Sequence, residues 1–178
     1  MTVAVLRDPT AETSEVNRPR KPPPQSLDDK TVALLDIGKM RGDEFVDRME
    51  QLFATRGIST KRYKKPTNTR TAPVEIIQDI VSDVDVVVIA LSDCGSCTSC
   101  STHDLNDLDQ LGIPGVNVLT EEFRHAFQQQ CSKIGFGGAS VYTPHPMQNR
   151  TTEQLHEFAD AVFEDILAAI TSTTILKR

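Results

Sequence analysis

The sequence predicts a three-layer α/β domain, in which a five-stranded parallel sheet is covered by helices on both faces. Short apolar runs of strand length alternate along the chain with segments whose apolar residues recur at helical spacing. Within those runs apolar residues follow one another without polar interruption, which is typical of strands buried on both faces of a parallel sheet. With 178 residues, the chain is long enough to bury such a core without disulfide bonds.

The first half of the domain is predicted to contain three strands and two helices. Residues 32–35 are a continuous apolar strand, and residues 45–57 carry aromatic and aliphatic side chains at helical spacing before a closing glycine. Residues 59–63 are more polar, which favours an edge strand. A second helix spans the apolar positions of 74–81, and residues 85–91 form the most apolar strand of all.

The second half continues the same alternation. A helix begins just after the cysteine cluster and stops at Gly112, and residues 115–119 follow as the fourth strand. Apolar positions in 123–134 predict the fourth helix, and residues 139–142 predict the fifth strand. The last helix is predicted to begin at Thr151, because Thr151 and Gln154 have the spacing of a capping box.

The predicted topology is the flavodoxin-like strand order 2-1-3-4-5 with right-handed crossovers, in a single domain over residues 30–172. In this order, ligands bind beyond the carboxyl ends of the strands, at the switch point between the first and third strands. Five of the ten prolines fall within residues 1–29, so this segment is expected to be a disordered or loosely packed tail, or a short arm lying on the domain. Residues 173–178 are expected to be a C-terminal tail.

Composition excludes several classes of partner. The net charge is −6 and basic residues are scattered, so nucleic acid is not expected. No apolar run approaches the ~20 residues that span a membrane, so no membrane partner is expected. Without a secretory signal, and with clustered cysteines, the expected location is the reducing cytoplasm. The chain has no Trp and two Tyr, so few aromatic side chains are present to line a flavin site.

Three of the four cysteines, Cys94, Cys97 and Cys100, lie within seven residues, directly after the third strand. Thiols at a helix N-terminus face unpaired N–H groups, which favour the thiolate. One interpretation makes Cys94 a nucleophile and Cys97 the thiol that resolves it. A second makes the three thiolates, with His103 or His145, ligands of Zn²⁺ or of an iron–sulfur cluster. A third makes them small residues that fill a tight turn.

Other polar residues fall on the same rim of the predicted sheet. His103, in the first turn of the helix after the cysteines, and His145, between two prolines, are candidates for proton transfer or substrate positioning. Asp104 is a candidate for orienting His103. Lys39 follows the first strand and is a candidate for holding a carboxylate, and Glu121 follows the fourth strand. Cys131, on the apolar face of a helix, is expected to be a buried core thiol.

These residues together resemble the UGSC-motif family, named for a Sec/Cys-Gly-Ser-Cys element, over about residues 31–170. The pieces that carry the resemblance are Cys94-Gly95-Ser96-Cys97-Thr98-Ser99, Ser101, His103-Asp104, Gly112-Ile113-Pro114, Thr120-Glu121-Glu122-Phe123 and Pro144-His145-Pro146. The family is similar in turn to the selenocysteine region of component B of glycine, sarcosine and betaine reductases. In that component the selenocysteine attacks the α-carbon of the substrate and displaces its amine. The resemblance therefore implies that Cys94 is the nucleophile. Cys100 departs from the family pattern, which usually has Trp there.

The sequence thus predicts an enzyme, a thiol-dependent oxidoreductase or lyase acting on a small organic acid or amine derivative. Its catalytic residues are predicted to be Cys94, Cys97, His103 and His145. Its substrate-binding residues are predicted to be Lys39, Gly95, Ser96, Thr98, Ser99 and Glu121. No cofactor is expected, a thiol compound would donate electrons, and a homo-oligomer is compatible with the sequence. The alternative is a non-catalytic module that binds zinc through Cys94, Cys97, Cys100 and His103, or binds a small molecule.

Overall fold

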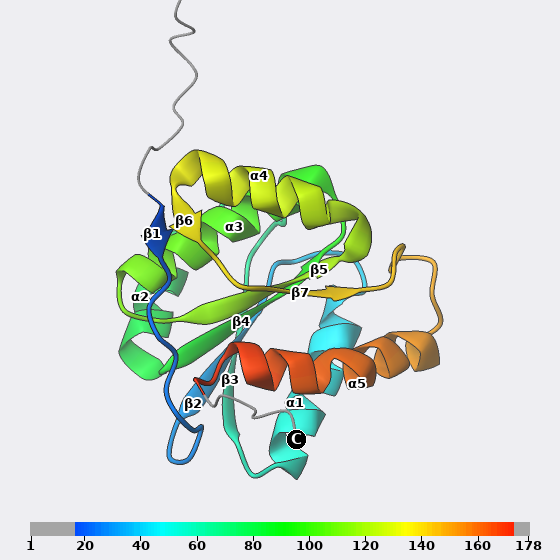
Figure 1. The fold of residues 1–178 in the computed structure, drawn as a ribbon. Coiled ribbons are helices and arrows are strands. Elements are labelled where there is room, and N and C mark those ends of the chain that lie inside the picture. The colour runs from blue at the N-terminus through cyan, green and yellow to red at the C-terminus, as the bar shows by residue number, and fades with distance from the viewer. Residues whose placement is uncertain (1–16, 173–178) are drawn as a thin grey trace, which may run out of the picture.

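The computed structural model of the chain describes residues 17–172 (Figure 1). Its centre is a five-stranded sheet, in the order β3-β2-β4-β5-β7, whose neighbouring strands are all parallel. The strands are β2 (Thr31–Asp36), β3 (Ser59–Lys64), β4 (Val86–Ser92), β5 (Gly115–Thr120) and β7 (Ser140–Thr143). Numbered along the chain these five strands have the order 2-1-3-4-5, so the predicted flavodoxin-like topology is confirmed.

Helices cover both faces of the sheet (Figure 1). One face packs against α1 (Gly42–Thr55) and α5 (Thr152–Ala169), and the other against α2 (Val74–Asp83), α3 (Gly95–Gln110) and α4 (Arg124–Ile134). The side chains of β2 show why a continuous apolar strand is needed. Val32 and Leu34 join the core on the α1 and α5 side, while Ala33 and Leu35 join the core on the opposite side. Every residue of β4 is likewise buried.

Short sequence motifs determine where two of the helices begin or end. The capping box of α5 is formed as predicted, because Thr151 Oγ1 accepts from Gln154 N at 3.3 Å and Gln154 Oε1 accepts from Thr151 N at 3.1 Å. Gly135 ends α4 in the left-handed conformation. A short 3₁₀ turn, η1 (Glu121–Phe123), precedes α4 and had no sequence signal. Among residues 17–172, every helix is either too short or too polar to cross a lipid bilayer.

Residues 17–29, the described part of the segment before residue 30, lie against the domain. Within it, β1 (Arg18–Pro19) pairs in parallel with β6 (Phe136–Gly137), and Arg18 forms an ion pair with the buried Asp109 of α3. Leu27 is buried in the core. Residues 17–29 therefore form a short arm on the domain, one of the two forms expected from the sequence, and the partners that hold Arg18 lie about ninety residues or more away along the chain. Residues 1–16 and 173–178 lie outside the described part, so the tails predicted there stay predictions.

Candidate active site

The candidate site begins where β4 ends and α3 starts. The helix begins at Gly95, inside the cysteine cluster and not after it as predicted, so His103 lies beyond its first turn. Cys94 is the N-cap of α3 in an extended conformation, and its Sγ accepts a hydrogen bond from the backbone N–H of Cys97 at 3.3 Å. Serine, threonine, aspartate or asparagine usually fill this position and accept with oxygen. The sulfur of Cys94 therefore sits among N–H groups that are not used inside the helix, at the positive end of the helix dipole.

The two thiols of the motif have opposite environments. Both are free, and Cys94 Sγ lies 2.6 Å from Cys97 Sγ. Burial, reinforced by the neighbouring Cys94, raises the pKa of Cys97 to about 12. Burial also opposes ionisation of Cys94, but hydrogen bonds from Cys97, Ser96 and the Cys97 backbone, with the charge of Lys39, outweigh it and lower the pKa of Cys94. Cys94 therefore loses its proton more readily than Cys97, and it is also the more exposed of the two thiols.

Asp93 connects these thiols to His145. Its backbone N–H donates to Cys97 Sγ at 3.3 Å, and its buried carboxylate lies 2.8 Å from His145 Nδ1. Thr120 Oγ1 donates to the same carboxylate oxygen at 3.1 Å and lies 3.0 Å from His145 Nδ1. If the single proton of a neutral imidazole lies on Nδ1, it is donated to the Asp93 carboxylate. Nε2 is then left as a hydrogen-bond acceptor. His145 remains partly exposed, with Phe123 packed edge-on against its ring.

A buried polar network supports the first turns of α3. Ser101 Oγ lies 2.8 Å from Ser92 Oγ and accepts from Asn117 Nδ2 at 2.7 Å. These three side chains come from α3, β4 and β5, and none is exposed to solvent. The two hydroxyls and the amide nitrogen of Asn117 bond to one another away from water, so the network fixes how α3 sits on the sheet.

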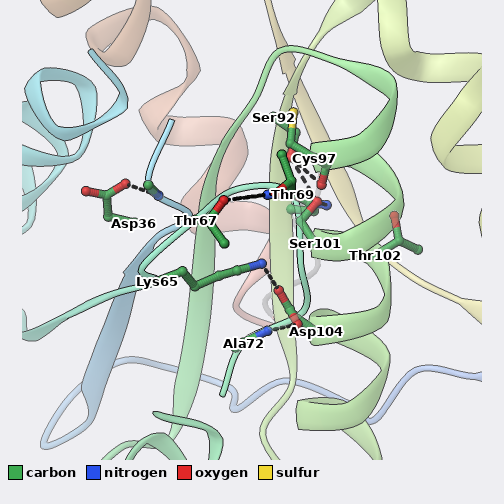
Figure 2. A network of polar contacts seen from close by, with 12 residues as sticks. Asp36, Lys65, Thr67, Thr69, Ala72, Ser92, Cys97, Ser101, Thr102 and Asp104 are labelled. Carbon is green, nitrogen blue, oxygen red and sulfur yellow. Dashed lines mark hydrogen bonds and ion pairs between the residues drawn. The ribbon is translucent and has the colours of Figure 1, made fainter. Parts of the chain in front are cut away.

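A second buried interaction lies one turn further along α3 (Figure 2). Lys65 Nζ, from the loop after β3, is 2.6 Å from Asp104 Oδ2, and both side chains are 1% exposed. Ala72 N also donates to Asp104, at 2.7 Å. Burial raises the pKa of Asp104 although Lys65 and Ala72 act against it. The expectation that Asp104 orients His103 was wrong, because its carboxylate faces Lys65 and Ala72 instead.

His103 is not brought to the thiols. Its Nε2 lies 2.9 Å from Gln130 Nε2 of α4, and it follows Cys94 by nine residues, or about 13 Å along the helix axis. The catalytic prediction for His103 therefore has no geometric support. Thr98 is also misplaced as a substrate-binding residue, because it is buried and its Oγ1 donates to the carbonyl of Cys94 at 2.8 Å.

The remaining predicted substrate-binding residues are accessible to different degrees. Gly95 and Ser96 are exposed, and Ser96 Oγ lies 3.5 Å from Cys94 Sγ. Lys39, partly exposed in the loop after β2, is close enough for its charge to act on both motif thiols. Ser99 is partly exposed on α3. Glu121 is exposed at the start of η1, beyond the end of β5.

The alternative metal site is not assembled in the described part of the chain. Among residues 17–172, no group of three or more His, Cys, Asp or Glu side chains is arranged to hold a metal ion. Cys100 is half-buried, and burial raises its pKa, against the influence of the nearby Lys65. Cys131 is buried in the core, as predicted.

Two residues of the site were missed by the sequence reasoning. Asp93 had a usable signal, because it is the first acidic residue after a fully buried strand, at the switch point. Lys65 had none, since a single lysine in a polar loop gives no indication that it is buried. Its partner is 39 residues away.

Comparisons with known proteins give one family and several distantly similar structures. The model of the UGSC family matches residues 5–172, nearly the whole chain. No curated protein matches. Among solved structures, a diflavin flavoprotein A3 from Nostoc sp. is 9% identical, with a TM-score of 0.48 over 79% of this chain and 93% of that one. A flavodoxin-like domain from Synechococcus sp. is 10% identical, with a TM-score of 0.44 over 78% and 96%.

Proposed function

This chain belongs to the UGSC family, and on that premise we propose that it is a thiol-dependent enzyme. Cys94 is its nucleophile and Cys97 its resolving thiol, and the substrate is a small organic acid or amine derivative. The observation that carries the proposal is the contrast between two sulfurs 2.6 Å apart, one with a lowered pKa at a helix N-terminus and one buried with a pKa of about 12.

The reaction has two steps. The Cys94 thiolate attacks an electrophilic carbon, so a C–S bond forms and the leaving group, an amine, departs with its bonding electrons and a proton. Cys97 then loses its proton and attacks Cys94 Sγ. A disulfide forms, the C–S bond breaks, and its electron pair passes to the carbon, which takes up a proton. The substrate is reduced by two electrons, and an external dithiol returns the Cys94–Cys97 disulfide to two thiols.

Residues around the thiols have supporting roles in this proposal. Asp93 and Thr120 hold His145 with Nε2 free, so His145 can move the proton that the leaving group or the product carbon needs. Lys39 attracts the carboxylate of the substrate and stabilises the Cys94 thiolate. His103 has no part, because it contacts Gln130 on the side of α4.

Alkylation with a matched pair of reagents tests the nucleophile and Lys39 together. Iodoacetate carries a carboxylate and iodoacetamide does not, while both present the same electrophilic carbon. At neutral pH, Cys94 should react faster than Cys97 and Cys131, as peptide mapping would show. Lys39→Met should slow iodoacetate more than iodoacetamide. Preferential labelling of Cys131 would exclude Cys94 as the activated thiol.

Substitution of the resolving thiol tests turnover. In Cys97→Ser, intact mass spectrometry should find an adduct that accumulates on Cys94 with a true substrate, whereas Cys94→Ser should give none. Cys131→Ser is the control and should behave as the parent chain. If substrates bind but neither adduct nor disulfide forms in any variant, the chain is a small-molecule-binding module. If all three motif cysteines are needed for stoichiometric zinc, it is a metal-binding module.

A further inference from the structure

A cavity of about 530 Å³ lies between α4, β6 and β7. Five of its lining residues share one face of α4, because positions 124, 127, 128, 131 and 132 recur at helical spacing. Ser140 and Tyr142 are two residues apart, so they share a face of β7, and they line a second wall. Neither the motif thiols nor His145 line the cavity. Its volume is in the range of cavities that bind small molecules.

The cavity has an apolar floor and a polar rim. Its floor is formed by Phe127, Cys131 and Phe136, which line the cavity and are buried in the core. The lining residues of α4 that are exposed to solvent are all polar, and they are Arg124, Gln128 and Ser132. An apolar enclosure with a few polar groups at its mouth is typical of a small-molecule site, because the polar groups orient the ligand while the apolar surface holds it.

Arg124 gives the rim a positive charge. It is the charged side chain among the lining residues, and its guanidinium lies 3.6 Å from the centre of the Tyr142 ring. Ser140 Oγ donates to Tyr142 Oη at 2.8 Å, which helps to fix the ring. Within residues 17–172, no carboxylate lies at ion-pair distance from Arg124. Stacking uses the face of the guanidinium, so the N–H groups in its plane can donate to an anion.

We propose that this cavity binds a small carboxylate that carries an aromatic ring. The carboxylate pairs with the planar fork of Arg124, which can donate two parallel N–H···O bonds. The ring lies on the floor against Phe127 and Phe136, where burial of its apolar surface stabilises the complex. Arg124 and Ser132 are eight residues apart on α4, or about 12 Å, which accommodates a ring joined to a carboxylate by a short chain. The inference is independent of the thiol chemistry.

Three matched probes test the charge and the ring separately in the full-length chain. 4-Phenylbutyrate has both groups, 4-phenylbutyramide has no charge, and butyrate has no ring. Calorimetric titration should show saturable binding of 4-phenylbutyrate at millimolar concentration, and the other two probes should bind about tenfold more weakly or worse. In amide NMR spectra, the signals of Gly137 and Gly138, which line the cavity, should shift with 4-phenylbutyrate, whereas that of Gly57 at the end of α1 should not.

Substitution of Arg124 decides where the carboxylate binds. Arg124→Gln should weaken 4-phenylbutyrate to the level of the amide, and Arg124→Lys, which keeps the charge without the fork, should fall between. Arg56→Gln is the matched control and should bind as the parent chain does, because Arg56 also lies over an aromatic ring, that of Phe163, but outside the cavity. If Lys39→Met abolishes binding and Arg124→Gln does not, the probe occupies the thiol site and the proposal is wrong. No saturable binding, or equal affinity for the acid and its amide, would also overturn it.

Discussion

Replacing Asp104 with asparagine should strongly destabilise the protein, although it changes a single non-hydrogen atom. The Lys65–Asp104 pair is 2.6 Å apart with both side chains 1% exposed, so the variant leaves an ammonium group buried without its counter-ion. Breaking a buried ion pair on one side typically costs about 3–5 kcal/mol. Asparagine keeps an oxygen for the Ala72 N–H, so the loss measures the charge and not that hydrogen bond. For a chain of this length the loss corresponds to about 6–20 °C in melting temperature.

The double variant Lys65→Met/Asp104→Asn should recover most of this loss. It removes both charges, fills the space of the lysine stem with a side chain of similar length, and keeps the bond to Ala72. Burial raises the pKa of Asp104 even beside Lys65, which indicates that desolvation outweighs the attraction within the pair. Replacing both partners of such a pair with neutral residues is often neutral or stabilising.

Urea unfolding of the parent chain, the two single variants and the double variant would measure these free energies. Asp83→Asn is a matched control, because Asp83 also pairs with a lysine but at the surface. It should cost far less than Asp104→Asn, because solvent screens an exposed ion pair. Lys65→Met should regain stability as the pH falls, since without Lys65 the pKa of Asp104 rises further and the folded protein binds a proton more readily than the unfolded chain. If Asp104→Asn costs no more than Asp83→Asn, the pair is not buried as described and the reasoning fails.

Three further results are expected. Hydrogen bonds from Arg41 and Thr152 hold the pKa of Glu44 at about 2, below its usual 4.5, so the parent chain should lose stability as the pH falls from 4.5 towards 2. Glu44→Gln should flatten this part of the stability–pH curve, and an unchanged slope would contradict the assignment. Thr151→Ala removes the N-cap oxygen of α5 and should cost about 1 kcal/mol in urea unfolding, whereas no cost would mean that the cap is formed by other groups. His103→Gln should leave the alkylation rate of Cys94 unchanged, and a marked slowing would return His103 to the site.

The sheet and its helices could be predicted because they depend on local patterns. The uninterrupted apolar run of β4 indicates burial on both faces, and the observed strand is fully buried. The polar residues 59–63 were expected to form an edge strand, and β3 lies at the edge of the sheet. The capping box of α5 is a signal contained within four residues. In each case the residues that carry the signal are also the residues that form the element.

Contacts between distant segments could not be predicted in this way. Arg18 reaches Asp109 and Lys65 reaches Asp104 across 91 and 39 residues, and no local pattern marks these partners. The prediction of a catalytic role for His103 lacks support for the opposite reason. It is close to Cys94 in the sequence, but each helical residue turns by about 100°, and the side chain emerges towards α4. Closeness along the chain indicates a shared site only when the helical face is also shared.

The sulfur that caps α3 is the atom that the proposed chemistry consumes. As a thiolate, Cys94 Sγ is a good acceptor for the hydrogen bond from the Cys97 N–H. Alkylation, oxidation or disulfide formation lowers the electron density on the sulfur and weakens this hydrogen bond. Each covalent state of Cys94 therefore changes how firmly the first turn of α3 is held. Ser92, Ser101 and Asn117 anchor the helix one turn below and keep the disturbance local. If the proposed chemistry holds, each reaction cycle would therefore loosen and re-form a single helical turn at the surface of the protein.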